Sequence, residues 1–421
     1  MPHLLRASCV ALLAPALLPA QHAMFTATRD SVSVMATVIA TRTAPALAGQ
    51  PRSEVLVTQP MLMLRGARRR GAVQFATMLN AERWTMPDGE PVAGIWGEGF
   101  VDRRHPHTIV HEVMLTGERR SNRLRVSIAG GKGIVPFGTD DPMVRPMSKY
   151  PANHHFSQIL ERVQLVGAIR LGSRLAVEAA TFNGDEPAGP SSAPVWRRFG
   201  DSRSARLSLW PIPTLEVQGS SAFVRSPEFG SGEGLDQQKS SASVRWTPAR
   251  TVVRYAFVEW ARTEERYRKR EIIGYGTVLA ELLARHRWLT FAGRLERTSR
   301  PEEERLLDPF RTSRPPTDLT IKGVTRWRIA TLHAGVQLPQ KGRVHGTLFA
   351  EVAHAHSTPL LRPILLDPKD IIGASAAWQA SVGLRLGVGA MSARVGRYGA
   401  AASGVMTDAR LTMPHDHTGR H

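Results

Sequence analysis

Histidine residues gather in two stretches of the chain where they could hold a metal ion. Neutral imidazole nitrogens and carboxylate oxygens are ligands that suit Zn(II) or Cu(II). The candidate ligands are His105, His107, His111, His154, His155 and Asp102. The spacing H-x-H-x3-H of the first stretch matches no established metal signature. A second interpretation therefore stays open, in which two loops fold inward and these histidines form a constriction held by hydrogen bonds to loop backbone.

A serine and two aspartates beside the second histidine stretch raise the question of catalysis. Ser157 follows His154 closely, and Asp140 and Asp141 precede it. Barrel hydrolases combine a serine nucleophile, a histidine base and an orienting acid or amide. Proximity in sequence does not specify such a triad. A barrel lipid hydrolase is therefore the least favoured function, and we predict that the chain is not an enzyme.

Nine arginines lie on the polar faces of segments whose other face is apolar. They are Arg123, Arg125, Arg174, Arg206, Arg245, Arg294, Arg326, Arg328 and Arg385. A charge on the lipid face of a membrane barrel costs about 2–4 kcal/mol at the bilayer midplane, so we expect these side chains to line the lumen. Glu178, Glu296 and Glu351 are the clearest acids on the same faces. Two interpretations remain open, an anion-favouring pore and a structural ladder of arginine–carboxylate pairs.

Segments in which apolar and polar residues alternate must position these side chains. Ala242, Val244 and Trp246, for example, alternate with polar residues, and such a period of two indicates a half-buried β-strand. The segments approach the 9–11 residues that cross a bilayer at a tilt. Long connections, among them 262–273, alternate with short ones. Outer-membrane barrels have this pattern of long extracellular loops and short periplasmic turns.

The pattern predicts an all-β protein, a transmembrane antiparallel β-barrel of about 18 strands. With 18 strands every long connection falls on one side and both termini fall in the periplasm. A barrel of 16 strands, without the first and last segments, is the alternative. We expect the connections 96–117 and 132–162 to fold inward. The predicted strands are 29–41, 54–65, 71–79, 109–118, 122–129, 162–169, 173–183, 202–210, 214–224, 237–247, 250–261, 274–285, 287–297, 319–333, 344–355, 375–387, 390–398 and 404–413.

The N-terminus has the order of a secretory signal peptide over residues 1–20. Arg6 precedes a short apolar run, Ala7 to Leu18, and Ala20 offers a small residue for cleavage. The run is too short to span a bilayer. Cys9 is the single cysteine, so cleavage would leave residues 21–413 as one barrel without disulfides. The histidine-bearing tail, 414–421, is expected to be disordered.

The net charge of +19 is spread along the chain and forms no basic arm. Nucleic acid is therefore the least favoured partner, whereas anionic lipid or an anion in a basic lumen would account for the charge.

Four phrases carry a resemblance that covers most of residues 30–413. The chain resembles a group of uncharacterised bacterial outer-membrane β-barrel proteins similar to phosphate-selective porins. The resemblance implies an outer-membrane pore and brings no catalytic residue with it. The phrases are WGEGFVDRRHPHTIVHEVMLTG (96–117), FGTDDPMVRPMSKYPANHHFSQILERV (137–163), TFNGDEP (181–187) and RFGDSRSARLSL (198–209).

We therefore predict a porin-like channel of the outer membrane for passive diffusion of small polar solutes, with anions as the candidate class. The alternative is an outer-membrane protein that binds copper or zinc, and apart from such an ion no cofactor is expected. The expected partners are outer-membrane lipid and small polar solutes. The sequence leaves the oligomeric state open.

Overall fold

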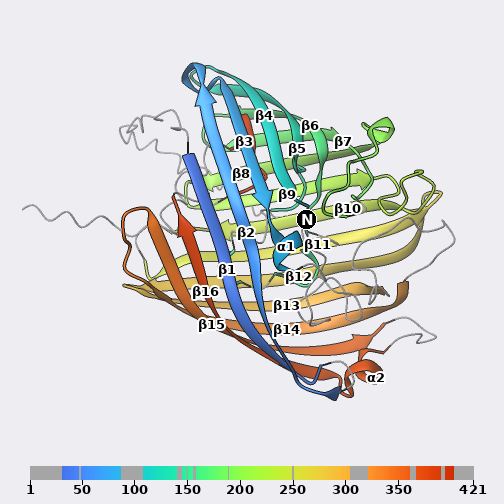
Figure 1. Cartoon of the computed structure of the whole chain (residues 1–421). Coiled ribbons are helices and arrows are strands. Elements are labelled where there is room, and N and C mark those ends of the chain that lie inside the picture. Colours follow the sequence, from blue (N-terminus) through green and yellow to red (C-terminus); the bar gives the residue numbers. More distant parts are fainter. Residues whose placement is uncertain are drawn as a thin grey trace, which may run out of the picture.

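The structure is a computed structural model of the chain, in which β-strands dominate (Figure 1). The signal peptide predicted at 1–20 and the tail at 414–421 lie outside the described residues. The structure describes residues 31–46, 49–86, 108–139, 145–148, 150–154, 158–187, 189–248, 251–303, 321–360, 367–389 and 394–402.

Sixteen antiparallel strands form a closed barrel in which each strand pairs with its neighbours in chain order. The barrel closes between β1 and β16, from the pair Val34–Val388 to the pair Ala44–Trp378. The strands are β1 (Ser31–Ala44), β2 (Arg52–Arg68), β3 (Val73–Asn80), β4 (Val110–Arg120), β5 (Leu124–Ile134), β6 (Glu161–Leu171), β7 (Leu175–Phe182), β8 (Ser202–Ile212), β9 (Leu215–Val224), β10 (Asp236–Trp246), β11 (Val253–Tyr267), β12 (Arg270–His286), β13 (Leu289–Glu303), β14 (Ile321–Gln337), β15 (Val344–Pro359) and β16 (Ala376–Val388).

Short helices occur only in connections and after the last strand of the described chain. They are α1 (Glu82–Thr85), α2 (Pro368–Ile372) and the 3-10 turns η2 (Arg69–Gly71), η5 (Trp196–Arg198) and η6 (Gly399–Ala401). None of the helices in the described ranges is long and apolar enough to cross a membrane.

The predicted barrel is confirmed with 16 strands, the stated alternative, and the count of 18 is wrong. The first predicted segment is a strand, because β1 closes the barrel. The described part of the predicted segment 390–398 is not a strand. None of its described residues is assigned to a strand, and Gly396 adopts a φ of 82°, far from the extended values of a regular strand. The last predicted segment, 404–413, lies outside the described residues.

The two ends of the barrel differ in their connections. Long connections follow β3, β5, β7, β13 and β15 and share one end, here called the long-loop end. The β4–β5, β6–β7 and β8–β9 turns lie at the opposite, short-turn end, where β1 begins and β16 finishes. The long connection predicted at 262–273 is wrong. There β11 and β12 continue to a two-residue turn, Arg268-Lys269, with φ values of 47° and 71°.

The faces of the wall alternate as a membrane barrel requires. On β8, Ser204, Arg206 and Ser208 are buried toward the inside, whereas Leu207 and Leu209 are exposed on the outside. Large apolar side chains are exposed in this way on strand after strand, and so wide an exposed apolar surface fits lipid rather than water. Trp246 and Trp288 are exposed beside short turns, as expected for an aromatic girdle.

Candidate functional site: a constriction inside the barrel

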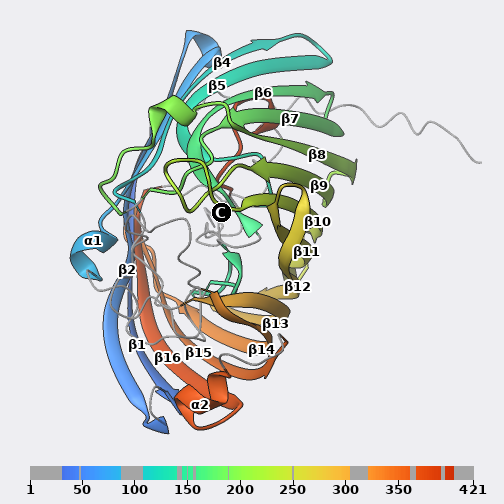
Figure 2. The same cartoon turned by 90° about the vertical axis from the view of Figure 1, so that its right-hand side faces the viewer.

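The β5–β6 connection, which belongs to the range 132–162 expected to fold inward, turns into the barrel in its described parts. Its described parts contain Phe137, Arg145 and His154, all almost completely buried. In Figure 2 the described parts of this loop, drawn in teal, lie within the ring of strands. We call residues 135–160 the inner loop.

The inner loop is fastened to strands far around the wall. The Gly138 amide donates a hydrogen bond to Ser220 Oγ on β9 (2.9 Å). Ser148 donates from its amide and its hydroxyl to Glu351 Oε1 on β15 (2.7 and 2.6 Å). On β2, Gln59 Nε2 donates to Tyr150 Oη (2.6 Å). These anchors spread over the wall, so the loop crosses the lumen.

Glu259 on β11 is the acceptor on which the inner loop converges. Arg145 Nη2 and Gln158 Nε2 donate to its Oε2 (2.9 and 2.6 Å), and Thr139 Oγ1 donates to its Oε1 (3.1 Å). Burial alone would lower the pKa of Arg145. The Glu259 and Glu281 carboxylates reverse this and hold that pKa above its ordinary value. Arg145 is therefore a buried permanent cation that needs its carboxylates.

Two further strands continue this network. Glu281 on β12 accepts from Arg294 Nε (2.7 Å) and from Tyr255 Oη (3.0 Å). Glu296 on β13 accepts from the Ala152 amide of the inner loop (3.0 Å). Arg294 and Glu296 were predicted to line the pore. They do face inward, where they form part of the scaffold that holds the loop.

Gly138 packs closely against the backbone of Gln158, in the same inner loop. It has a φ of 65°, and a Cβ there would lie 1.7 Å from the Gln158 carbonyl oxygen. We expect Gly138→Ala to displace the loop and to lower the free energy of unfolding by at least about 1–3 kcal/mol, the usual range for local backbone strain. Urea titration of the refolded barrel measures this change. Gly167→Ala is the control, since its Cβ would meet nothing within 4 Å. Equal stability of both variants would contradict the prediction.

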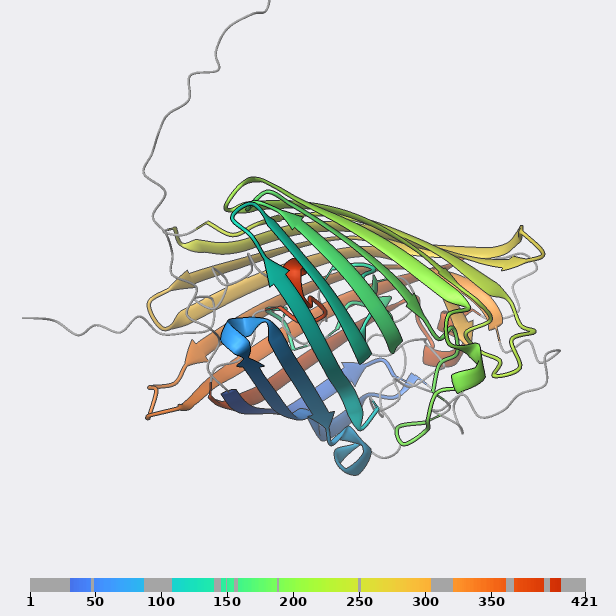
Figure 3. The same ribbon diagram turned by 90° about the horizontal axis from the view of Figure 1, so that it is seen from above.

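A second segment enters the lumen after the last strand. We call residues 394–402 the C-terminal inner segment; its η6 turn lies against β4 to β7 on the inside of the wall (Figures 1 and 3). Ala400 and Ala401 are fully buried. Tyr398 Oη accepts from the Ile134 amide (3.0 Å) and donates to Glu112 Oε2 (3.3 Å). This segment returns from the short-turn end into the barrel.

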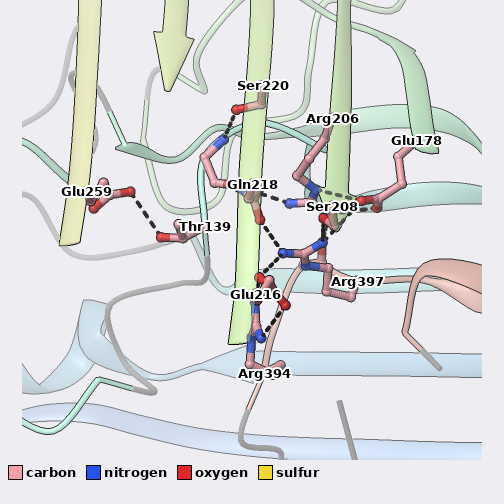
Figure 4. A network of polar contacts seen from close by, with 12 residues as sticks. Thr139, Glu178, Arg206, Ser208, Glu216, Gln218, Ser220, Glu259, Arg394 and Arg397 are labelled. Carbon is pink, nitrogen blue, oxygen red and sulfur yellow. Dashed lines mark hydrogen bonds and ion pairs between the residues drawn. The ribbon is translucent and has the colours of Figure 1, made fainter. Parts of the chain in front are cut away.

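Two arginines hold the C-terminal inner segment to the wall (Figure 4). Arg394 donates from both terminal nitrogens to Glu216 on β9 (3.2 and 3.0 Å). Arg397 donates to Glu216 Oε1 (3.2 Å), to Glu178 Oε2 (3.4 Å) and to Gln218 Oε1. Burial is the main cause that lowers the pKa of Arg397 to about 10. At neutral pH Arg397 is therefore charged, next to the two carboxylates that accept from it.

Arg206 on β8 connects the two inserted segments. It makes a bidentate pair with Glu178, at 2.6 Å for each bond. Its other contacts run to Gly138 O of the inner loop (3.4 Å) and Gly396 O of the C-terminal inner segment (2.9 Å). Three guanidinium groups, those of Arg206, Arg394 and Arg397, thus share two carboxylates. The contacts of Arg206 and Glu178 agree with the second interpretation drawn from the sequence, a structural ladder of arginine–carboxylate pairs.

The nine predicted pore arginines divide into three groups. Those that face inward are Arg125, Arg206, Arg245, Arg294 and Arg385. Arg123 and Arg174 are not on the lumen wall. They lie exposed in the short β4–β5 and β6–β7 turns, one residue before the next strand begins.

Arg326 and Arg328 face outward, which corrects their predicted lumenal position. Their neighbours Trp327 and Ile329 face inward and pack with Ala152 of the inner loop. The prediction assumed that apolar side chains face lipid. The inner loop offers apolar contacts inside the barrel. The apolar side chains of this part of β14 therefore face inward and its arginines face outward, which is the reverse of the expected arrangement.

The histidines are only partly within the described chain. His105, His107, His155 and Asp102 lie outside it, as do Asp140, Asp141 and Ser157. His111 Nδ1 lies 2.7 Å from Glu161 Oε2, and His154 Nδ1 lies 3.1 Å from the Pro151 carbonyl oxygen. In the described ranges no group of three potential ligands could hold a metal ion. The zinc or copper site and the hydrolase stay predictions.

Several network residues were not singled out by the sequence. They are Arg145, Glu216, Glu259, Glu281, Arg394 and Arg397. A signal existed for Glu259, which alternates with the exposed Val258 and Trp260. It was obscured because the residues on the same face as Glu259 are the aromatic Tyr255 and Phe257. Nothing in the local pattern around Arg145, Arg394 or Arg397 indicates an ion pair, since their partners are distant in sequence.

Solved structures include barrels similar to this one. The anion-selective porin from Comamonas acidovorans is 11% identical, with a TM-score of 0.52, and the match covers 85% of this chain and 99% of that chain. OprB of Pseudomonas putida is 10% identical, with a TM-score of 0.51 and coverage of 86% and 94%. No family model and no curated protein matches the chain. At these identities the likeness shows a porin fold.

Proposed function

We propose that this chain is a porin-like channel of a Gram-negative outer membrane that passes small polar solutes by diffusion and favours anions. The porin fold and the exposed apolar wall support the membrane location. The inner loop and the C-terminal inner segment narrow the lumen, which suits small solutes. The similarity to phosphate-selective porins makes phosphate one candidate among the anions.

The proposed preference for anions rests on lumenal arginines that form no ion pair with a carboxylate in the described part of the barrel. The inward carboxylates Glu178, Glu216 and Glu259 each accept from an arginine. Arg285 and Arg385 also face inward, are only partly buried, and form no ion pair with another residue of the described ranges. Fixed positive charge in a confined path attracts anions and repels cations.

Planar-bilayer recording of the refolded chain tests this function. In a potassium chloride gradient we expect a reversal potential that shows chloride passing more readily than potassium. The variant Arg285→Gln/Arg385→Gln should weaken this preference, because two lumenal cations that have no ion pair in the described ranges are gone. Phosphate and sulfate in place of chloride then show whether the channel distinguishes among anions.

The double variant Arg123→Gln/Arg174→Gln is the matched control. It removes the same charge from exposed short turns. We expect it to keep the wild-type preference. Cation selectivity of the wild type would refute the anion preference, and a barrel that is folded but passes no current would refute the channel.

A further inference from the structure

The outer surface of the barrel carries a group of cations that the channel does not use. Arg297 on β13, Arg326 and Arg328 on β14, and His354 and His356 on β15 all face outward. The three strands lie side by side (Figure 1). We call these five residues the outer basic patch.

The register of the strands brings these side chains together. Arg297 is paired with Arg328, and Arg328 is paired with His356, so the three form one row across the sheet. Arg326 and His354 lie two residues away along their strands, on the same face. The row continues through Val278 to Trp260, whose side chain is 44% exposed. An exposed tryptophan in the same row indicates the boundary between apolar and polar membrane regions.

The height of the row agrees with this boundary. Arg297 lies nine residues beyond Trp288, which stands at the short-turn end. At about 3.3 Å per residue and a tilt of about 40°, nine residues rise roughly 23 Å. The apolar band of such barrels is about 25 Å tall. Arg328 likewise lies nine residues from Gln337, whose amide donates to the Trp288 carbonyl. The outer basic patch therefore lies at the headgroup level of the long-loop end.

The three arginines of the patch differ in their contacts from several other outward arginines. Arg262 is held by Glu264 and Glu271, and Arg42 donates to Ser53. Arg203 lies over the ring of Phe223. By contrast, the structure gives Arg297, Arg326 and Arg328 no hydrogen bond or ion pair with any residue in its described ranges. Three neighbouring guanidinium groups without a counter-charge repel one another unless an anion lies among them.

A groove in the outer surface joins the patch to the apolar band. Its volume is about 630 Å³, and Arg297, Arg328, His354 and His356 are among its lining residues. Toward the membrane core it is lined by Val258, Ala280, Leu295 and Ala330. The groove is a depression over small alanine side chains, and the longer side chains around them form its walls. One end of the groove suits an acyl chain and the other an anion.

We propose that the outer basic patch binds a phosphorylated lipid of the leaflet at the long-loop end. Guanidinium groups pair with phosphate oxygens in a bidentate geometry, and the groove would take one acyl chain of the same molecule. A free phosphate would use the basic end alone. A second copy of this chain would bring a like-charged patch against this one. The proposal needs a membrane-spanning barrel but does not depend on conduction.

Native mass spectrometry of the detergent-purified full chain tests the proposal. The probes are diphosphorylated lipid A, its fully dephosphorylated form and inorganic phosphate. We expect a bound diphosphorylated lipid in the wild type, and affinity at least about tenfold lower in Arg297→Gln/Arg328→Gln, since each basic residue adds to the attraction of an anionic headgroup. The control Arg42→Gln/Arg203→Gln removes the same charge elsewhere on the outer wall and should bind as the wild type does.

The other outcomes overturn the proposal. Equal binding by the patch variant, equal affinity for the dephosphorylated lipid, or displacement of the lipid by inorganic phosphate alone would each do so. Unchanged conductance of the patch variant shows that its barrel is intact. Loss of conduction in every variant, with lipid binding retained, would count against the channel and not against the lipid site.

Discussion

Removing the two arginines of the C-terminal inner segment is expected to raise single-channel conductance by about twofold or more, because the segment occupies part of the lumen cross-section. In Arg394→Ser/Arg397→Ser the four hydrogen bonds to Glu216 and Glu178 are lost. Glu178 keeps its bidentate pair with Arg206. The wall therefore stays folded while the segment loses its main anchors. Recording in planar bilayers measures the change.

Thiol labelling gives an independent measure of the same event. Ala400 is fully buried on the inside of the wall. A cysteine introduced as Ala400→Cys should react slowly with a water-soluble maleimide in the wild-type background and rapidly in the double variant. Arg123→Ser/Arg174→Ser, at exposed short turns, is the charge-matched control. Wild-type conductance together with rapid labelling in the double variant would show that the segment does not limit the current.

Loss of the Glu259 carboxylate is expected to be the most damaging single change to stability. Glu259→Ala leaves the buried Arg145 with Glu281 alone, at 3.5 Å, and removes the acceptor of Thr139 and Gln158. Breaking one member of a buried ion pair typically costs about 3–5 kcal/mol. We expect a loss of that size in the free energy of unfolding, measured by urea titration in lipid vesicles.

The same strand provides the control. Glu264 lies five residues further along β11, on the outer face, and its pairs with Arg262 and Arg266 are partly exposed. Exposed pairs contribute about 0–1 kcal/mol, so Glu264→Ala should change stability little. If both glutamate variants unfold at the same urea concentration, Glu259 is not the anchor of the inner loop.

Strand positions followed from the sequence because alternation is a local property. One side of each strand contacts lipid and the other does not, so residues such as Leu207 and Arg206 alternate wherever the chain crosses the membrane. An inward turn of residues 132–162 could also be expected from the sequence, since an exposed loop has little use for so many aromatic, proline and histidine side chains. The first and last strands could not be settled, because the alternation is weak at both ends of the chain.

The closure of the barrel, the parity of β14 and the entry of residues 394–402 were decided only in three dimensions. Arg328 faces outward because Trp327 finds Ala152 inside the barrel, across a separation that no local pattern records. Arg397 follows β16, so it meets Glu178 on β7 and Glu216 on β9 only when the barrel has closed. Alternation assigns a residue to one of two faces. Which face is the inside depends on what fills the lumen, and distant segments of the chain fill it.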